Sequence, residues 1–260
     1  MRRVSTVLAG CLLAGLATAG LAEAAPTVRF KAVPVPIKGF PHTGNILGAG
    51  AAVQAEYRIS GSEYAGFAPP LVGVRFYLPK GTVLHTAGFP TCSTAKLEQV
   101  GPAACPHASA AGPVGSVLGV VSFGTERVAE RATLESFYAP GGGIQFFTDG
   151  HSPVALEILS KAHYAHLGGA GGFGPELIAE VPLVATVSGA PFASVQTISV
   201  RAGSARRVHG KPVYYGRMPK KCPKGGFRVK TELIFDQGGA VPVVPEVVTE
   251  TYRSPCPRDR

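Results

Sequence analysis

Glycine and proline interrupt this chain at short intervals along most of its length. The 34 glycines and 23 prolines are spread along the chain rather than massed in one tract, so we interpret them as turns between many short strands. Hydrophobic residues make up 45% of the chain and charged residues 16%. A disordered chain carries more charge and fewer aromatic residues than this one. The sequence therefore predicts a folded protein with a sizeable core.

Two segments alternate apolar and polar residues with a period of two. They are residues 53–60 and 227–236, and the pattern is typical of a strand with one face on a core and one in water. Together with nine further β-rich segments, which are named below, they predict an all-β, antiparallel fold of the sandwich or jelly-roll kind. Short helices are expected at Thr94–Val100, capped by Ser93, and at Pro153–Ala162. The other β-rich segments, bounded by glycine or proline, are 27–35, 71–78, 114–123, 132–139, 143–148, 181–188, 195–202, 212–217 and 246–253.

Residues 25–260 are expected to form a single sandwich-like domain. The glycine-rich stretch 168–174 is the best candidate for a flexible division. Two halves that meet near these residues therefore stay open as an alternative.

The first 24 residues read as a secretory signal. Met1-Arg2-Arg3 is a basic start, an apolar run reaches Leu21, and Ala22-Glu23-Ala24 places small residues where a signal peptidase cuts. We expect cleavage after Ala24 and a secreted or envelope location. The alternative is the lipobox Leu8-Ala9-Gly10-Cys11, which would leave a lipid-modified Cys11 as the first residue.

Four cysteines remain after the signal: Cys92, Cys105, Cys222 and Cys256. In an exported chain they indicate two disulfides, and three pairings are possible. We predict the local pairs, Cys92 with Cys105 and Cys222 with Cys256. Each bond would stabilise the fold by roughly 3–4 kcal/mol in the chain-entropy description.

Positive charge is concentrated in residues 181–231, which contain ten Lys and Arg and no carboxylate. Such a region attracts polyanions. Nucleic acid is not expected outside the cell, so anionic cell-wall polymer or a membrane surface is the expected partner. A solvated basic face that aids solubility is the alternative. The candidate anion-binding residues are Arg206, Arg207, Lys211, Lys220, Lys221, Lys224, Arg228 and Lys230.

No motif identifies a catalytic residue, a metal site or a cofactor site. Asp149-Gly150-His151-Ser152 combines an acid, an imidazole and a hydroxyl, but triad members are seldom adjacent in sequence, and the chain has no G-x-S-x-G motif. A polar turn explains the segment better. His163 and His166 would share one face only on a helix, and the glycines that follow disfavour one.

Several blocks of the chain resemble a recurring pattern in secreted proteins of high-GC actinobacteria. They are Gly88-Phe89-Pro90-Thr91-Cys92-Ser93 with Cys105-Pro106, Cys222-Pro223-Lys224-Gly225-Gly226-Phe227, and Pro255-Cys256-Pro257. No activity is known to us for those proteins. The resemblance implies a secreted, β-rich fold and carries over no functional residue.

These observations lead to one expected function and two alternatives. We expect an exported, non-catalytic binding or structural protein of the envelope that contacts anionic polymers or lipid head groups. The first alternative is a carrier that holds an apolar ligand such as a lipid, which requires an enclosed apolar cavity. The second is a secreted hydrolase, which requires polar groups that converge in a cleft.

Overall fold

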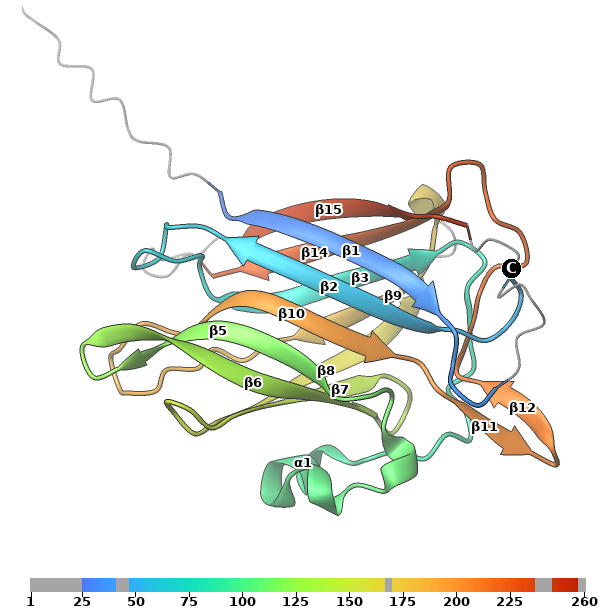
Figure 1. Cartoon of the computed structure of the whole chain (residues 1–260), viewed down its shortest axis with the longest axis horizontal. Helices are drawn as coiled ribbons and strands as arrows, with labels where there is room; N and C mark the ends of the chain where they lie inside the picture. Colours follow the sequence, from blue (N-terminus) through green and yellow to red (C-terminus); the bar gives the residue numbers. More distant parts are fainter. Residues whose placement is uncertain (1–24, 41–46, 167–169, 237–244, 257–260) are drawn as a thin grey trace, which may run out of the picture.

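One antiparallel sheet of eleven strands organises the molecule (Figure 1). The structure, a computed structural model, describes residues 25–40, 47–166, 170–236 and 245–256. The strands of the large sheet are β1 (Thr27–Val35), β2 (Ala52–Ser60), β3 (Leu71–Pro79), β5 (Gly115–Phe123), β6 (Glu126–Tyr138), β7 (Ile144–Gly150), β8 (Leu156–His166), β9 (Phe173–Glu180), β10 (Ser194–Ala202), β14 (Phe227–Phe235) and β15 (Glu246–Ser254).

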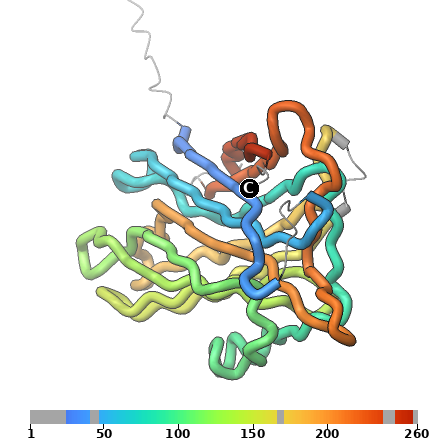
Figure 2. Tube along the Cα trace, turned by 45° about the vertical axis from the view of Figure 1, so that its right-hand side comes forward, coloured from blue at the N-terminus to red at the C-terminus, as the bar shows by residue number. Residues whose placement is uncertain are grey.

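The order of the strands is β1-β2-β10-β5-β6-β7-β8-β9-β3-β14-β15, and the sheet curls until its two edges meet. The rings of Phe30 on β1 and Tyr252 on β15 lie edge to face with their centroids 6.4 Å apart. Figures 1 and 2 both show these strands side by side. The predicted mostly β, antiparallel fold is therefore confirmed, and the nearly closed sheet is compatible with a sandwich-like or barrel-like arrangement. Strands that precede residues 168–174 in the sequence and strands that follow them are interleaved in this one sheet.

The inner face of the sheet carries the apolar residues of the alternating strands. On β14, Phe227, Val229 and Leu233 are buried and point inward, whereas Arg228 is exposed on the outer face. Fully burying such an apolar side chain stabilises the fold by about 1.5–3 kcal/mol. The sheet therefore encloses the main core, which it surrounds on nearly all sides.

A disulfide-linked helical segment covers part of the outer face. Helix α1 (Thr94–Val100) begins at Ser93, whose hydroxyl accepts a hydrogen bond from the backbone of Lys96, as expected. It packs Leu97 against Phe137 and Phe147 of β6 and β7. Two short 3-10 turns, Pro102–Ala104 and His107–Ser109, follow it. The Cys92–Cys105 disulfide closes this segment into a loop.

Smaller elements close one end of the sheet. The hairpin β11 (Ala205–Val208) and β12 (Lys211–Tyr214) projects from it, and β4 (Val83–Leu84) pairs with β13 (Gly216–Arg217) across the opening. The loop that leads into β14 is held by the Cys222–Cys256 disulfide. Both disulfides are the local pairs that the spacing predicts. They indicate an oxidising, extracytoplasmic environment.

Two of the expected elements are wrong. Pro153–Ala162 is not a helix: all of it from Leu156 onward belongs to β8, where inward Ile158 and Ser160 alternate with outward residues and the backbone pairs with β7. Segment 181–188 is not a strand. The strand lies just before it, as β9, because Pro182 and the following turn end the pairing with β3 at Glu180.

The expected signal peptide, residues 1–24 with Cys11, lies outside the described residues. In the part of the chain that the structure describes, no helix is long and apolar enough to cross a membrane.

Candidate functional site: an apolar cavity inside the sheet

The interior of the sheet is partly hollow. A chamber of about 190 Å³ lies between strands β2, β3, β5 to β10 and the segment that follows β9. Its lining is aliphatic and aromatic apart from three hydroxyl side chains, those of Tyr57, Thr148 and Ser160. Burial raises the pKa of Tyr57, which also hydrogen-bonds with Thr231. Tyr57 is therefore neutral at physiological pH, and the chamber offers a surface for apolar molecules.

The hollow arises from the number of strands and from small side chains on them. Ala55, Ala179 and Ala202 face the chamber from β2, β9 and β10. Ile198 and Val200 on β10 point inward and yet are only half-buried. A closed sheet of about eight strands is just wide enough for side chains to fill, and its diameter grows with strand number. The eleven strands here therefore enclose more space than these side chains fill.

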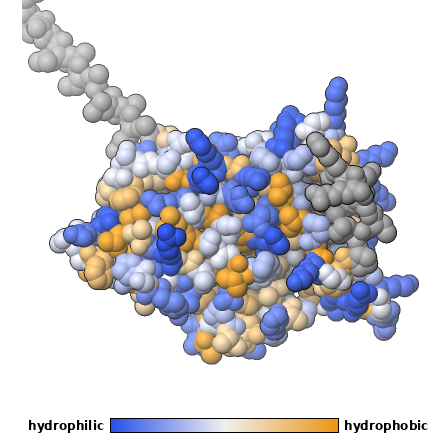
Figure 3. All heavy atoms as spheres, in the orientation of Figure 1, coloured by the Kyte–Doolittle hydropathy of each residue, from blue (hydrophilic) through white to orange (hydrophobic). Residues whose placement is uncertain are grey.

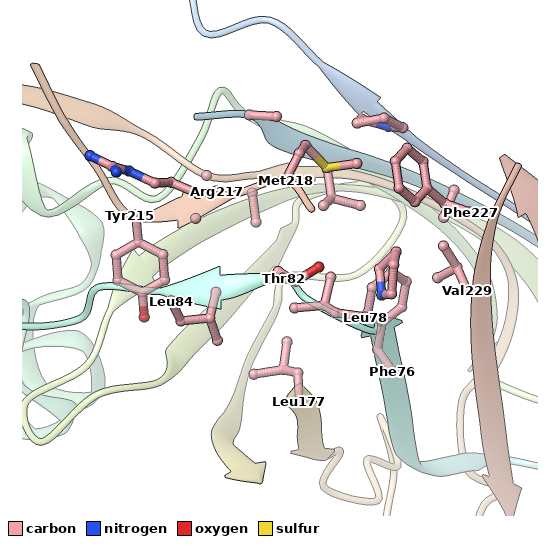
Figure 4. A pocket seen from close by; sticks show the side chains of 18 of the residues that line it. Phe76, Leu78, Thr82, Leu84, Leu177, Tyr215, Arg217, Met218, Phe227 and Val229 are labelled. Carbon is pink, nitrogen blue, oxygen red and sulfur yellow. The ribbon is translucent and has the colours of Figure 1, made fainter. Parts of the chain in front are cut away.

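A second chamber of about 100 Å³ adjoins the first under the β4–β13 pair (Figure 4). Leu84 and Met218 cover it from the closed end. The two chambers share lining residues, so they are neighbouring parts of one apolar interior. The shared residues are Val53, Phe76, Leu177 and Ala202.

The small chamber has polar atoms of its own. Tyr215 donates a 3.5 Å hydrogen bond to the carbonyl of Gly143, and burial raises the pKa values of Tyr215 and Tyr164. Both phenols are thus neutral. The hydroxyls of Thr82 and Ser254, which also line this chamber, are different: the oxygen of each is buried and has no hydrogen-bond partner among the described residues. Arg217 contributes to the lining, but its exposed side chain extends away from the chamber.

Six of the eight candidate anion-binding residues lie at the closed end of the sheet. Figures 1 and 2 place hairpin β11–β12 and the loop before β14 at this end, and hydrophilic side chains are prominent near the hairpin in Figure 3. None of the six forms an ion pair with a carboxylate of the described residues. They are Arg206 and Arg207 on β11, Lys211 on β12, and Lys220, Lys221 and Lys224 in the loop.

Two of these cations form cation–π contacts with aromatic rings. The guanidinium of Arg206 lies 5.5 Å from the ring centroid of Phe89, and that of Arg207 lies 5.5 Å from the centroid of Phe40. Such contacts leave the positive charge uncompensated while fixing the side chain.

The other two candidates, Arg228 and Lys230, lie on the outer face of β14. Lys230 donates to Glu232 at 2.7 Å and sits 3.7 Å from the ring centroid of Tyr77. Burial disfavours the charged form of Glu232, but the hydrogen bonds from Lys230 and Tyr77 outweigh it and lower its pKa. Lys230 is therefore neutralised locally, and it does not add a free charge to the closed end.

The acid–imidazole–hydroxyl segment forms an exposed turn. His151 Nε2 lies 3.0 Å from Asp149 Oδ2, and the His151 side chain is 78% exposed. The backbone N–H groups of Ser152 and Val154 donate to the buried carboxylate of Glu130. No hydrogen bond joins the Ser152 hydroxyl to His151 in the described structure, so a Ser–His relay is not assembled here.

The histidine pair does not have the helical spacing that a shared face requires, because residues 163–166 belong to strand β8. Within the described ranges, no three His, Cys, Asp or Glu side chains gather into a possible metal site.

Sequence reasoning raised an apolar cavity only as a requirement of the carrier alternative, and it did not locate the cavity or identify Thr82. Alternation identifies which side chains face inward in residues 53–60, and a small inward residue such as Ala55 is a signal for a loosely filled interior. Thr82 follows a lysine–glycine turn, and nothing in its sequence context indicates that its hydroxyl is buried.

Comparison with known proteins gives no further guide to the site. No protein-family model, no curated protein and no solved structure matches the chain.

Proposed function

We propose that the mature protein is an exported, non-catalytic binding protein that holds a small apolar molecule inside its sheet. The single observation that carries this proposal is the apolar interior of two adjoining chambers of about 190 and 100 Å³. A dry cavity of about 150 Å³ is large enough for a benzene-sized molecule. The ligand is therefore a small hydrocarbon-like molecule rather than a whole membrane lipid.

Export to the cell envelope or the medium belongs to the same proposal. The basic start, apolar run and small residues of 1–24 support it, and so do the two disulfides. An extracytoplasmic carrier meets apolar molecules in water, where they need a protein to shield them.

Calorimetric titration with naphthalene tests the proposal, with Ala179→Leu as the variant that fills the large chamber. Ala179 is the next-to-last residue of β9 and faces the chamber. We expect wild type to bind naphthalene and Ala179→Leu to bind it at least tenfold more weakly, because leucine occupies the space of the ligand. Ala129→Leu, on an exposed position of β6, is the matched control and should bind as wild type does.

Absence of naphthalene binding by wild type would refute the proposal. Equal binding by wild type and Ala179→Leu, both folded by circular dichroism, would place any binding elsewhere and refute it as well.

A second candidate function rests on the six cations of the closed end. We propose that they contact anionic wall polymer or anionic lipid head groups, because their charge is not compensated by described carboxylates. This contact is compatible with the carrier function, since it would hold the protein at the envelope surface.

A further inference from the structure

The hydroxyl of Thr82 is a buried polar group without a partner. Its backbone N–H donates to the carbonyl of Pro79 at 3.1 Å, which fixes the residue in the turn after β3. Its side-chain oxygen makes no hydrogen bond to any described residue. In Figure 4 this oxygen points into the small chamber, toward the space between Met218 and Leu78.

A buried hydroxyl without a hydrogen-bond partner raises the free energy of the folded protein. Most buried polar side-chain atoms have a hydrogen-bond partner, and those without one need an explanation. The neighbouring side chains Leu78, Leu84 and Met218 are apolar and offer no strong acceptor. A partner supplied by a bound molecule would satisfy the group.

We propose that the ligand is an amphipathic molecule with one uncharged hydrogen-bonding head group, such as a hydroxyl, which pairs with Thr82. The apolar body of the ligand passes Phe76 and Leu177 into the large chamber. This inference rests on the proposed carrier function and names the ligand class of the same cavity.

The chambers favour a neutral head group over an anionic one. A buried carboxylate without a cation is strongly disfavoured. Arg217 is the one cationic residue in the lining that the structure describes, and its side chain is exposed and directed away. The phenols of Tyr164 and Tyr215 are kept neutral by burial. The small chamber thus offers hydrogen bonds and no compensating charge.

The test compares hexanol, hexane and hexanoate by calorimetric titration of wild type and Thr82→Val. Valine has nearly the shape of threonine and lacks the hydroxyl. We expect hexanol to bind wild type three- to tenfold more tightly than it binds Thr82→Val, which is the range for one hydrogen bond. Hexane should bind both proteins equally, and hexanoate should bind both more weakly than hexanol does.

Two further variants separate the hydroxyl from its surroundings. Thr82→Ser keeps the hydroxyl and should keep most of the preference for hexanol over hexane. Thr251→Val, at an exposed position of β15, should behave as wild type. Without ligand, Thr82→Val should melt at a higher temperature than wild type, because an unpaired buried polar group is removed.

Each other outcome counts against the inference in a distinct way. If naphthalene binds but hexanol has the same affinity for wild type and Thr82→Val, the role of Thr82 is wrong and the carrier function stands. If hexanoate binds wild type more tightly than hexanol, the head group is anionic and the inference is overturned. If neither naphthalene nor any hexane derivative binds wild type, the proposed function and the inference both fall.

Discussion

Removal of the Cys222–Cys256 disulfide is expected to destabilise the protein strongly. The bond links the loop before β14 to the residues that follow β15, and its cysteines are 34 positions apart. It therefore encloses the whole β14–β15 hairpin. β15 is an edge strand, so it gains no backbone pairing from β1 even though the two strands are close.

The magnitude follows from the length of the closed loop. In the chain-entropy description, closing a loop of this length lowers the entropy of the unfolded chain. The disulfide thereby contributes about 3.8 kcal/mol to the free energy of unfolding at 25 °C. For a domain of this size, such a loss lowers the melting temperature by about 8–15 °C. Both cysteines are only partly buried, so replacing them adds little cavity cost.

The second disulfide provides the comparison. Cys92 and Cys105 are 13 positions apart, which predicts a smaller entropic contribution of about 2.9 kcal/mol. Cys92 is, however, fully buried against Leu97 and Phe147. Its replacement by alanine therefore adds a packing cost, and the two double variants should lose similar amounts of stability by different routes.

Urea unfolding at equilibrium measures these losses, followed by tyrosine fluorescence because the chain has no tryptophan. We compare wild type with Cys222→Ala/Cys256→Ala and with Cys92→Ala/Cys105→Ala. The dependence of the unfolding free energy on urea should steepen for each variant, because the unfolded chain expands when a cross-link is lost. A loss below 1 kcal/mol for the Cys222→Ala/Cys256→Ala variant would refute the reasoning from loop length.

The remaining predictions concern the outer face of β14 and the closed end. Glu232 has a lowered pKa in the folded protein, so its contribution to stability is present above the pKa of the unfolded chain, near 4.5, and is lost as the pH falls through the lower folded value. Glu232→Gln should therefore lower the free energy of unfolding by roughly 1 kcal/mol at pH 7 and by little at pH 3, as measured by thermal unfolding. Glu157→Gln, at an exposed position, should have the stability of wild type. Equal losses of stability by Glu232→Gln at both pH values would contradict this prediction. Lys220→Glu/Lys221→Glu/Lys224→Glu should bind anionic vesicles or wall polymer less than wild type at low salt, and wild-type binding should weaken as the Debye length falls to about 8 Å. Binding that is insensitive to both changes would mean that the cations form only a solvated face.

Local patterns were sufficient to predict much of the fold. The alternation of residues 227–236 gives the inward and outward faces of β14 directly, because successive strand residues point to opposite sides. Ser93 predicts the start of α1, because its hydroxyl satisfies a backbone N–H that the helix leaves open. The pairing of cysteines follows from sequence distance, since both partners lie at the ends of compact local segments.

Predictions failed where tertiary pairing decides between two acceptable local structures. Residues 156–162 suit a helix or a strand by composition, and the adjacent β7 selects the strand by supplying backbone partners from Ile144 to Gly150. Segment 181–188 contains β-branched residues, but β9 already occupies the place beside β3, and Pro182 cannot donate to a ladder.

The cavity lies beyond sequence reasoning for a different physical reason. Alternation predicts that Ala55 and Tyr57 share one face of their strand, but the free space beside them depends on how many strands surround the interior and on how far apart these strands lie. Both quantities come from the closure of the whole sheet, which brings β1 and β15 together through residues as distant in sequence as Phe30 and Tyr252. The Thr82 hydroxyl is likewise buried only in the folded chain, in the small chamber beside the β4–β13 pair. A site that is formed by closure of a sheet has no local sequence motif, because its residues come from strands that are far apart in the chain. The chemistry of this interior can therefore be described only from the folded structure.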